Sequence, residues 1–215
     1  MQALRIPTDP ADASSVARIL AAAEALFSEQ GFDAVSMNTI AARAGVSKAN
    51  IFHHFSSKSA LYLAVVKDAC KESQSRLQRL ENGTGNFVER LAHFGHSQLQ
   101  SMLEHSQATR LILRDLLENG AQRGKDLAEQ VFGQNFARLV EMIRDGQARS
   151  ELRRELDPAA VALMLIAVNL YFFEARDLLR HYPDVDFADD PQRYSEKMLQ
   201  LMLHGILPDP KEQQP

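Results

Sequence analysis

Apolar residues recur every three to four positions along nearly the whole chain, and no segment alternates apolar and polar residues as a half-buried strand does. In the first strongly periodic segment, Ile19, Ala23, Leu26 and Phe27 form one stripe. The spacing predicts an all-α protein. We expect helices over residues 15–30, 37–44, 48–55, 57–80, 87–104, 108–118, 125–144, 158–181 and 192–204.

Capping residues support several of these limits. Ser36 and Ser47 stand where an N-cap is expected before the second and third helices, and Ser56 before the fourth. Asn86 followed by Glu89 is the pattern of a capping box for the helix that starts at Phe87. The second, third, fourth and fifth helices are therefore expected to begin at well-defined residues.

The longest apolar run is AAVALMLIAV, residues 159–168, which continues past Asn169 as LYFF. Asp157 followed by Pro158 is a cap and a first-turn proline, so a helix begins there. The run is shorter than the roughly 20 residues that span a bilayer. We interpret it as a buried helix and expect no membrane association.

Two short helices joined by Ala44, Gly45, Val46 and Ser47 predict a helix-turn-helix, with Gly45 supplying the positive φ of the tight turn. The chain then divides into an N-terminal three-helix DNA-binding domain and a C-terminal helical bundle. The expected boundaries are an arm over 1–14, the helix-turn-helix domain over 15–60, the bundle over 61–207 and a disordered tail over 208–215.

Charge is unevenly distributed. The 215 residues carry a net charge of −4, yet residues 1–80 are net +2 and residues 81–215 net −6. Residues 36–58 contain no Asp or Glu. Because DNA affinity rests largely on phosphate neutralisation, a carboxylate here would weaken binding. The basic patch for a phosphate backbone is expected in this stretch.

The third helix has the two faces that a recognition helix needs. On a helical wheel its apolar side carries Ile51, Phe52 and Phe55, and its polar side carries Ala49, Asn50, His53 and His54. An asparagine can contact adenine with two hydrogen bonds in the major groove, so we expect Asn50 to read a base. Lys58 lies at the next helix N-terminus, a position that attracts phosphate.

At these residues the chain resembles the tetracycline-repressor (TetR) family of transcription regulators. The resemblance covers residues 16–66 and rests on Ala22–Ala23, Leu26–Phe27, Gly31–Phe32, Ser36, Ile40–Ala41, Ala44–Gly45–Val46–Ser47, Phe52–His53–His54–Phe55, Ser57–Lys58 and Leu61. Two positions depart from the family pattern. Phe52 replaces a tyrosine whose hydroxyl commonly touches a phosphate, and Ser59 replaces an acidic residue.

The resemblance implies a homodimer with one recognition helix on each half of a palindromic double-stranded operator. We also expect a cytoplasmic protein. The resemblance further implies a repressor that is released when a small effector binds the C-terminal domain. The motif and the resemblance together assign these residues to DNA: Ser36, Asn38, Thr39, Ser47, Lys48, Ala49, Asn50, His53, His54 and Lys58.

Aromatic residues and methionines outnumber charges at the expected effector positions, so a largely apolar effector is predicted. The candidates are His93, His96, Met102, Phe132, Phe136, Asn169 and Phe173. Asn169 interrupts an apolar helix, and its amide needs a partner: an effector, the opposing subunit or a backbone carbonyl. The last two helices are expected to form the dimer interface through Leu163, Ala167, Leu170, Tyr194, Met198, Leu201 and Met202.

Two alternatives stay open. The first is a regulator of the same fold that answers to a protein partner or to no ligand. The second is a metal-dependent enzyme on a helical bundle, since Glu89, His93 and His96 share a helix face. The chain shows no nucleophile–base signature and no phosphate loop, so we expect no enzyme, cofactor or metal. Its single cysteine, Cys70, suits a reducing compartment.

Overall fold

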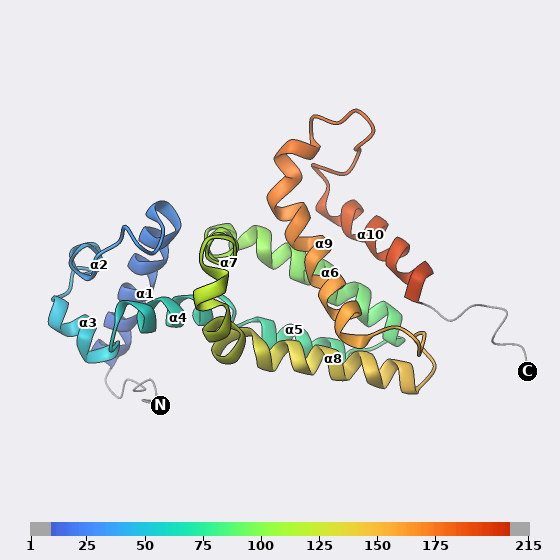
Figure 1. Ribbon diagram of the computed structural model, residues 1–215, viewed down its shortest axis with the longest axis horizontal. Coiled ribbons are helices and arrows are strands. Elements are labelled where there is room, and N and C mark those ends of the chain that lie inside the picture. The colour runs from blue at the N-terminus through green and yellow to red at the C-terminus, as the bar shows by residue number, and fades with distance from the viewer. Residues whose placement is uncertain (1–9, 207–215) are drawn as a thin grey trace, which may run out of the picture. The chain divides into compact units, whose positions relative to one another are not determined.

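The computed structural model describes the backbone of residues 10–206 and the side chains of residues 14–117 and 123–205, and that part of the chain is all helical (Figure 1). The predicted tail, 208–215, and most of the predicted arm, 1–14, lie outside the described residues. The helices are α1 Pro10–Gln30, α2 Met37–Ala44, α3 Lys48–His54, α4 Lys58–Ala69, α5 Ser73–Asn82, α6 Phe87–Glu104, α7 Ser106–Leu127, α8 Gly133–Ala148, α9 Pro158–Leu179 and α10 Pro191–Ile206, with a π-helical turn, η1, over Ala128–Phe132.

The first of two compact units contains α1 to α4 together with α7 and η1. Helix α1 packs against α2, α4 and α7, and α2 packs against α3. Its core holds Phe27, Ile40, Ile51 and Leu61, all fully or almost fully buried. The sequence assigned residues 105–132 to the C-terminal bundle, whereas their contacts lie with the N-terminal helices.

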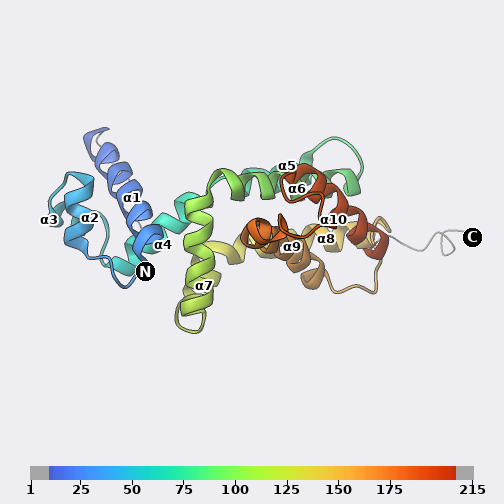
Figure 2. The ribbon, with the colours of Figure 1, turned by 90° about the horizontal axis from the view of Figure 1, so that it is seen from above.

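The second unit contains α5, α6, α8, α9 and α10. Helix α6 packs against α5, α9 and α10, and α8 packs against α5 and α9; Figure 2 gives a second view of these helices. Its main core includes Leu80, Leu91, Leu139 and Ile143. A smaller cluster forms where α9 and α10 meet, and Phe172 is its fully buried centre.

Where the caps were strong, the predicted limits are confirmed. Helix α2 spans Met37–Ala44 and α6 spans Phe87–Glu104, as expected. The capping box is present, since the backbone N–H of Glu89 donates to Oδ1 of Asn86 (2.8 Å) and that of Asn86 to Oε2 of Glu89 (3.2 Å). The cap of α4 was misplaced by one residue: Oγ of Ser57, not of Ser56, accepts from the N–H of Ala60.

Other limits differ from the prediction. Helix α1 begins at Pro10 rather than near residue 15, and the single helix expected over 57–80 breaks at Cys70–Glu72. Asn119–Gly120 does not end a helix, because α7 continues to Leu127 and joins α8 through η1. Packing of α7 on α1 and α4 outweighs the weak helix propensity of that dipeptide.

Helix α9, the apolar helix, spans Pro158–Leu179, close to the expected 158–181. Within the described residues it is the one helix that is long and apolar enough to cross a bilayer by length and composition, with a mean hydropathy of 1.7. Core helices of globular proteins meet the same criteria. Here α9 packs against α6 and α8 and contributes Val161, Ala162 and Leu165 to the core of the second unit.

Candidate nucleic-acid interface

The turn between α2 and α3 is built by its capping residues. Gly45 adopts the left-handed conformation at φ 65°, and its N–H reaches the carbonyl of Ala42 (3.3 Å) while that of Val46 reaches Ala41 (3.1 Å). Ser47 then caps α3, with its Oγ accepting from the N–H of Asn50 at 3.1 Å. The result is two helices held at a fixed turn, as a helix-turn-helix requires.

The exposed face of α3 consists of Lys48, Ala49, Phe52 and His53. Lys48 and Phe52 are four residues apart, as are Ala49 and His53, so all four lie on one side of the helix. The sequence placed Phe52 on the buried side, and that was wrong, since its side chain is 46% exposed. Only Ile51 and Phe55, four residues apart, reach the core. Nζ of Lys48 lies 5.9 Å from the ring centroid of Phe52. The face therefore joins an apolar ring, a methyl group and two nitrogen-bearing side chains, without a carboxylate.

Asn50 and His54 lie at the edge of this face, and both are half-buried. Oδ1 of Asn50 is shielded from solvent and accepts no hydrogen bond from the residues that the structure describes. Buried acceptors usually receive a hydrogen bond, so this oxygen is available to accept one from a ligand. Asn50 thus sits beside the exposed face rather than at its centre, and the predicted base contact would come from the rim of the helix.

The start of α2 also has a serine cap and exposed polar side chains. Ser36 caps the helix, with its Oγ accepting from the N–H of Thr39 at 3.1 Å and lying 2.8 Å from the hydroxyl of Thr39. Asn38 and Thr39 are exposed. Arg43, at the other end of α2, is held by two hydrogen bonds to the carboxylate of Glu29 at 3.1 and 3.2 Å. The polar residues at the start of α2 remain accessible.

The ammonium group of Lys58 makes contacts that the sequence did not predict. Its Nζ donates to the carbonyl oxygens of Phe32 (2.8 Å) and Val35 (3.0 Å), with that of Asp33 at 3.4 Å. The same nitrogen lies 4.3 Å from the ring centroid of Phe32. The three protons of the ammonium are directed to the loop between α1 and α2. A phosphate contact would have to compete with these carbonyls, so the structure gives Lys58 a structural role first.

The predicted effector residues are divided between the two units. Phe132 packs against the core of the first unit, whereas Phe136 packs against that of the second. His93 is exposed, His96 and Met102 are half-buried, and Phe173 is buried. Phe132 lies at the end of η1 in the first unit and the other candidates lie in the second unit, so their shared effector site stays a prediction.

The amide of Asn169 bonds a backbone carbonyl, one of the three partners that the sequence left open. Its Nδ2 donates to the backbone carbonyl of Gly95 (2.8 Å) and to Oε1 of Gln98 (3.1 Å), both on α6. The side chain is buried between α6 and α9. The amide therefore ties two helices of one subunit together.

The predicted dimer residues also separate into two sets. Tyr194 belongs to the subunit's own core: its ring stacks on Phe172 with centroids 4.0 Å apart, and its hydroxyl donates to the carbonyl of Val168 at 2.5 Å. Burial raises the pKa of Tyr194 to about 12. Met198 and Met202 likewise pack inward. Tyr194 is thus a core residue of its own subunit, whereas Met198 and Met202, both half-buried, stay predicted interface residues.

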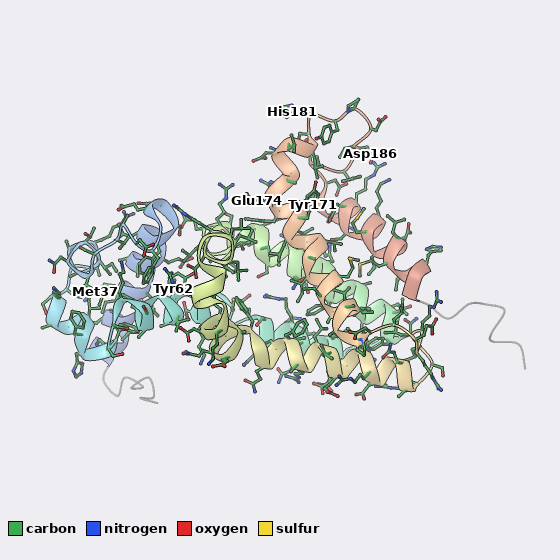
Figure 3. The ribbon with its side chains drawn as sticks, viewed as in Figure 1. Met37, Tyr62, Tyr171, Glu174, His181 and Asp186 are labelled. Atoms are coloured by element: carbon green, nitrogen blue, oxygen red, sulfur yellow. The ribbon has the colours of Figure 1, made fainter. Side chains whose placement is uncertain are left out.

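On α9, by contrast, predicted interface residues are open. Leu163 is 59% exposed, Ala167 is exposed and Leu170 is half-buried. Tyr171, labelled on α9 in Figure 3, is 63% exposed. On α10, Leu201 is 68% exposed. Among the described helices, α9 carries the most exposed large apolar side chains.

The three residues on α6 that suggested a metal site, Glu89, His93 and His96, do not act together. The carboxylate of Glu89 accepts from the N–H of Asn86 in the capping box, so it does not join His93 and His96. Among the described residues, no group of three or more His, Cys, Asp or Glu is placed to hold a metal ion.

Sequence patterns gave no signal for a charged pair inside the first unit. Asp115, only 4% exposed, accepts from Nη1 of Arg123 at 2.7 Å. Both residues lie on α7. Tyr62 of α4, labelled in Figure 3, is packed against Phe27 and Phe32, and burial together with the Asp115 carboxylate raises the pKa of its hydroxyl.

The helix-turn-helix and its exposed α3 face define a DNA-binding transcription regulator. The family model described as "Bacterial regulatory proteins, tetR family" matches residues 19–65, which include α2, α3 and the turn between them. Residues 19–65 therefore form a DNA-binding segment of the TetR family of transcription regulators.

Similarity extends beyond the matched segment. The chain is 26% identical over 196 residues to the HTH-type transcriptional regulator UidR of Escherichia coli (strain K12), covering 88% of this chain and 91% of the relative. Its fold is similar to that of the fatty acid degradation regulator FadR from Bacillus halodurans (TM-score 0.76, 16% identity, 93% and 98% covered). It is also similar to Salmonella enterica GusR (TM-score 0.69, 22% identity, 92% and 96% covered).

Proposed function

We propose that this regulator is a cytoplasmic homodimeric repressor that binds a palindromic operator and is released by a small, largely apolar effector. The observation that carries the DNA-binding part is the exposed face of α3, which holds Lys48, Ala49, Phe52 and His53 and no carboxylate. A major groove admits one α-helix, and side chains on its outer face reach base edges.

Within that face we assign base contacts to Ala49 and His53 near its centre and to Asn50 at its rim. A methyl group can pack on thymine, and imidazole nitrogens and amides can bond base edges. Lys48 reaches outward for a guanine or a phosphate. Phe52 has no hydroxyl, so it offers the groove apolar contact only.

The dimer is supported by the exposed apolar residues of α9. Leu163, Ala167 and Tyr171 repeat every four residues along one side, with Met164 (53% exposed) beside them. Such a stripe on a charged protein marks an interaction surface. A twofold interface would place the stripe against its copy and present two α3 helices to a palindromic site.

Light scattering at micromolar concentration tests the dimer. We expect the mass of two chains for the wild-type protein and of one chain for Leu163→Lys, because burying a lysine at the centre of the interface is unfavourable. Leu117→Lys, on an exposed leucine of α7, is the matched control and should remain dimeric. A wild-type monomer would contradict the proposal.

We assign the effector to the second unit, with half-buried His96 of the predicted set as the polar group that orients it. A thermal-shift screen of lipophilic compounds tests this, since a ligand that binds only the native state raises the midpoint of unfolding. A hit should also release DNA. If the tightest ligand is a small, highly charged metabolite, the effector class is wrong, and if none binds, control by a protein partner is favoured.

A further inference from the structure

The buried pair of Asp115 and Arg123 in α7 has contacts that lead toward the DNA-binding motif. Taking two charges out of water is unfavourable, and well-packed apolar residues often give equal or greater stability. Stability alone is therefore a weak explanation for the pair. Asp115 anchors the guanidinium of Arg123, and the contacts of that guanidinium indicate a positional role.

Arg123 reaches the loop between α1 and α2. Its Cζ lies 3.7 Å from the ring centroid of Phe32, within cation–π range. Its Nη2 is 3.7 Å from Oδ1 of Asp33 in the same loop. Its Cζ is also 5.3 Å from the ring centroid of Tyr62 on α4, whose ring meets that of Phe32 edge to face. Arg123 therefore joins α7 to both α4 and the loop.

The same loop meets α7 at a second point. Gly31 has φ +82°, a conformation that glycine adopts freely. A Cβ there would lie 3.1 Å from the guanidinium of Arg114, which shows how closely this α7 side chain covers the loop. From α4, the ammonium of Lys58 bonds the carbonyls of Phe32 and Val35. The loop is held from two helices.

This loop leads directly into the motif that binds DNA. Val35 is buried, and the next residue, Ser36, is the N-cap of α2. Helix α2 is tied to α3 through Gly45 and the shared core. A displacement of residues 31–35 would therefore move the start of α2, and α3 with it.

We propose that Arg123 and Asp115 are positioning residues for DNA binding: through Phe32 and Asp33 they fix the loop that sets the placement of α2 and α3. They act from α7, which lies outside the helix-turn-helix. Neither residue contacts DNA in this role. Asp115 neutralises and orients the guanidinium, and the flat guanidinium rests on the Phe32 ring as an ammonium could not.

The test compares Arg123→Lys with Phe32→Leu and with the double variant, using DNA selected by the wild-type protein from a random pool. Arg123→Lys keeps the charge beside Asp115 but loses the flat contact with the ring. At a temperature where circular dichroism shows all variants folded, each single variant should bind selected DNA roughly tenfold more weakly. The double variant should bind the selected DNA no more weakly than the single variant with the lower affinity, because both substitutions remove the contact between Arg123 and the Phe32 ring.

Two readouts separate positioning from a general loss of stability or of charge. The slope of log affinity against log salt should stay at the wild-type value, because no phosphate contact is lost. Hydrogen exchange without DNA should become faster at backbone amides of residues 31–44 and stay unchanged in α8 and α9. Arg110→Lys, at an exposed position of α7, is the matched control and should change neither readout.

Three results would overturn the proposal. The first is a folded Arg123→Lys protein that binds selected DNA with wild-type affinity, whatever its melting temperature. The second is a salt slope lowered by about one unit per subunit, which would make Arg123 a phosphate contact. The third is additive losses in the double variant. If Arg123→Lys does not fold, Asp115→Asn takes its place, with the same expected loss, salt slope and exchange pattern.

Discussion

Replacing Lys58 with alanine should lower stability rather than the salt dependence of DNA binding. The change removes an ammonium that donates to Phe32 and Val35 at 2.8 and 3.0 Å, with Asp33 at 3.4 Å. Hydrogen bonds to charged groups contribute about 1.5–3 kcal/mol each. Because Lys58 is half-buried and Asp33 is exposed, we count only the two shorter bonds at the lower value. The expected loss is about 3 kcal/mol in the free energy of unfolding.

Urea denaturation followed by circular dichroism measures this loss. Lys58→Met keeps the aliphatic stem and removes the donors, so it should lose most of the same free energy. Lys67→Ala, at an exposed position of the same helix, is the control and should change stability by less than about 0.5 kcal/mol. Equal stabilities of the Lys58 variants and the wild-type protein would refute the reasoning.

A salt titration of DNA binding completes the test of Lys58. If the ammonium neutralises a phosphate, Lys58→Ala flattens the slope of log affinity against log salt by about one unit per subunit. If it holds the loop, the slope keeps its wild-type value while affinity falls on every DNA. A flattened slope with unchanged stability would return Lys58 to the phosphate contacts that the sequence predicted.

Three further substitutions test other contacts. Ser47→Ala removes the cap that Asn50 N–H uses, so it should cost about 1 kcal/mol in urea denaturation and weaken operator binding. Asn169→Leu leaves buried acceptors on α6 without their donor, so urea denaturation should show a loss of about 1–3 kcal/mol. Tyr194→Phe removes the bond to Val168 and should cost about 1 kcal/mol, while light scattering finds an unchanged dimer.

The parts of the fold that followed from the sequence are those with local causes. A serine cap and a glycine terminator fixed both ends of α2, and the reciprocal bonds of Asn86 and Glu89 fixed the start of α6. Such interactions span three or four residues, so a linear pattern contains them. The break at Cys70–Glu72 carries neither glycine nor proline, and no local pattern marks it.

Roles that depend on distant residues could not be predicted. The sequence shows that Lys58 is basic and precedes a helix, but not that the carbonyl of Phe32, 26 positions earlier, lies 2.8 Å from its Nζ. The burial of Tyr194 depends on its stacking with Phe172 of another helix. A helical wheel orders residues around one axis and does not tell which side meets a neighbour, and this is why Phe52 was assigned to the core.

The most direct test of DNA reading by α3 is selection from a random pool of duplexes, with sequencing of the DNA retained. The wild-type protein should retain fragments that share an inverted repeat. His53→Ala and Asn50→Ala should each lose preference at specific symmetric positions of that repeat, and His93→Ala, at an exposed histidine of α6, should keep the full pattern. Retained DNA without a shared sequence, or the same full pattern for both α3 variants, would contradict the account.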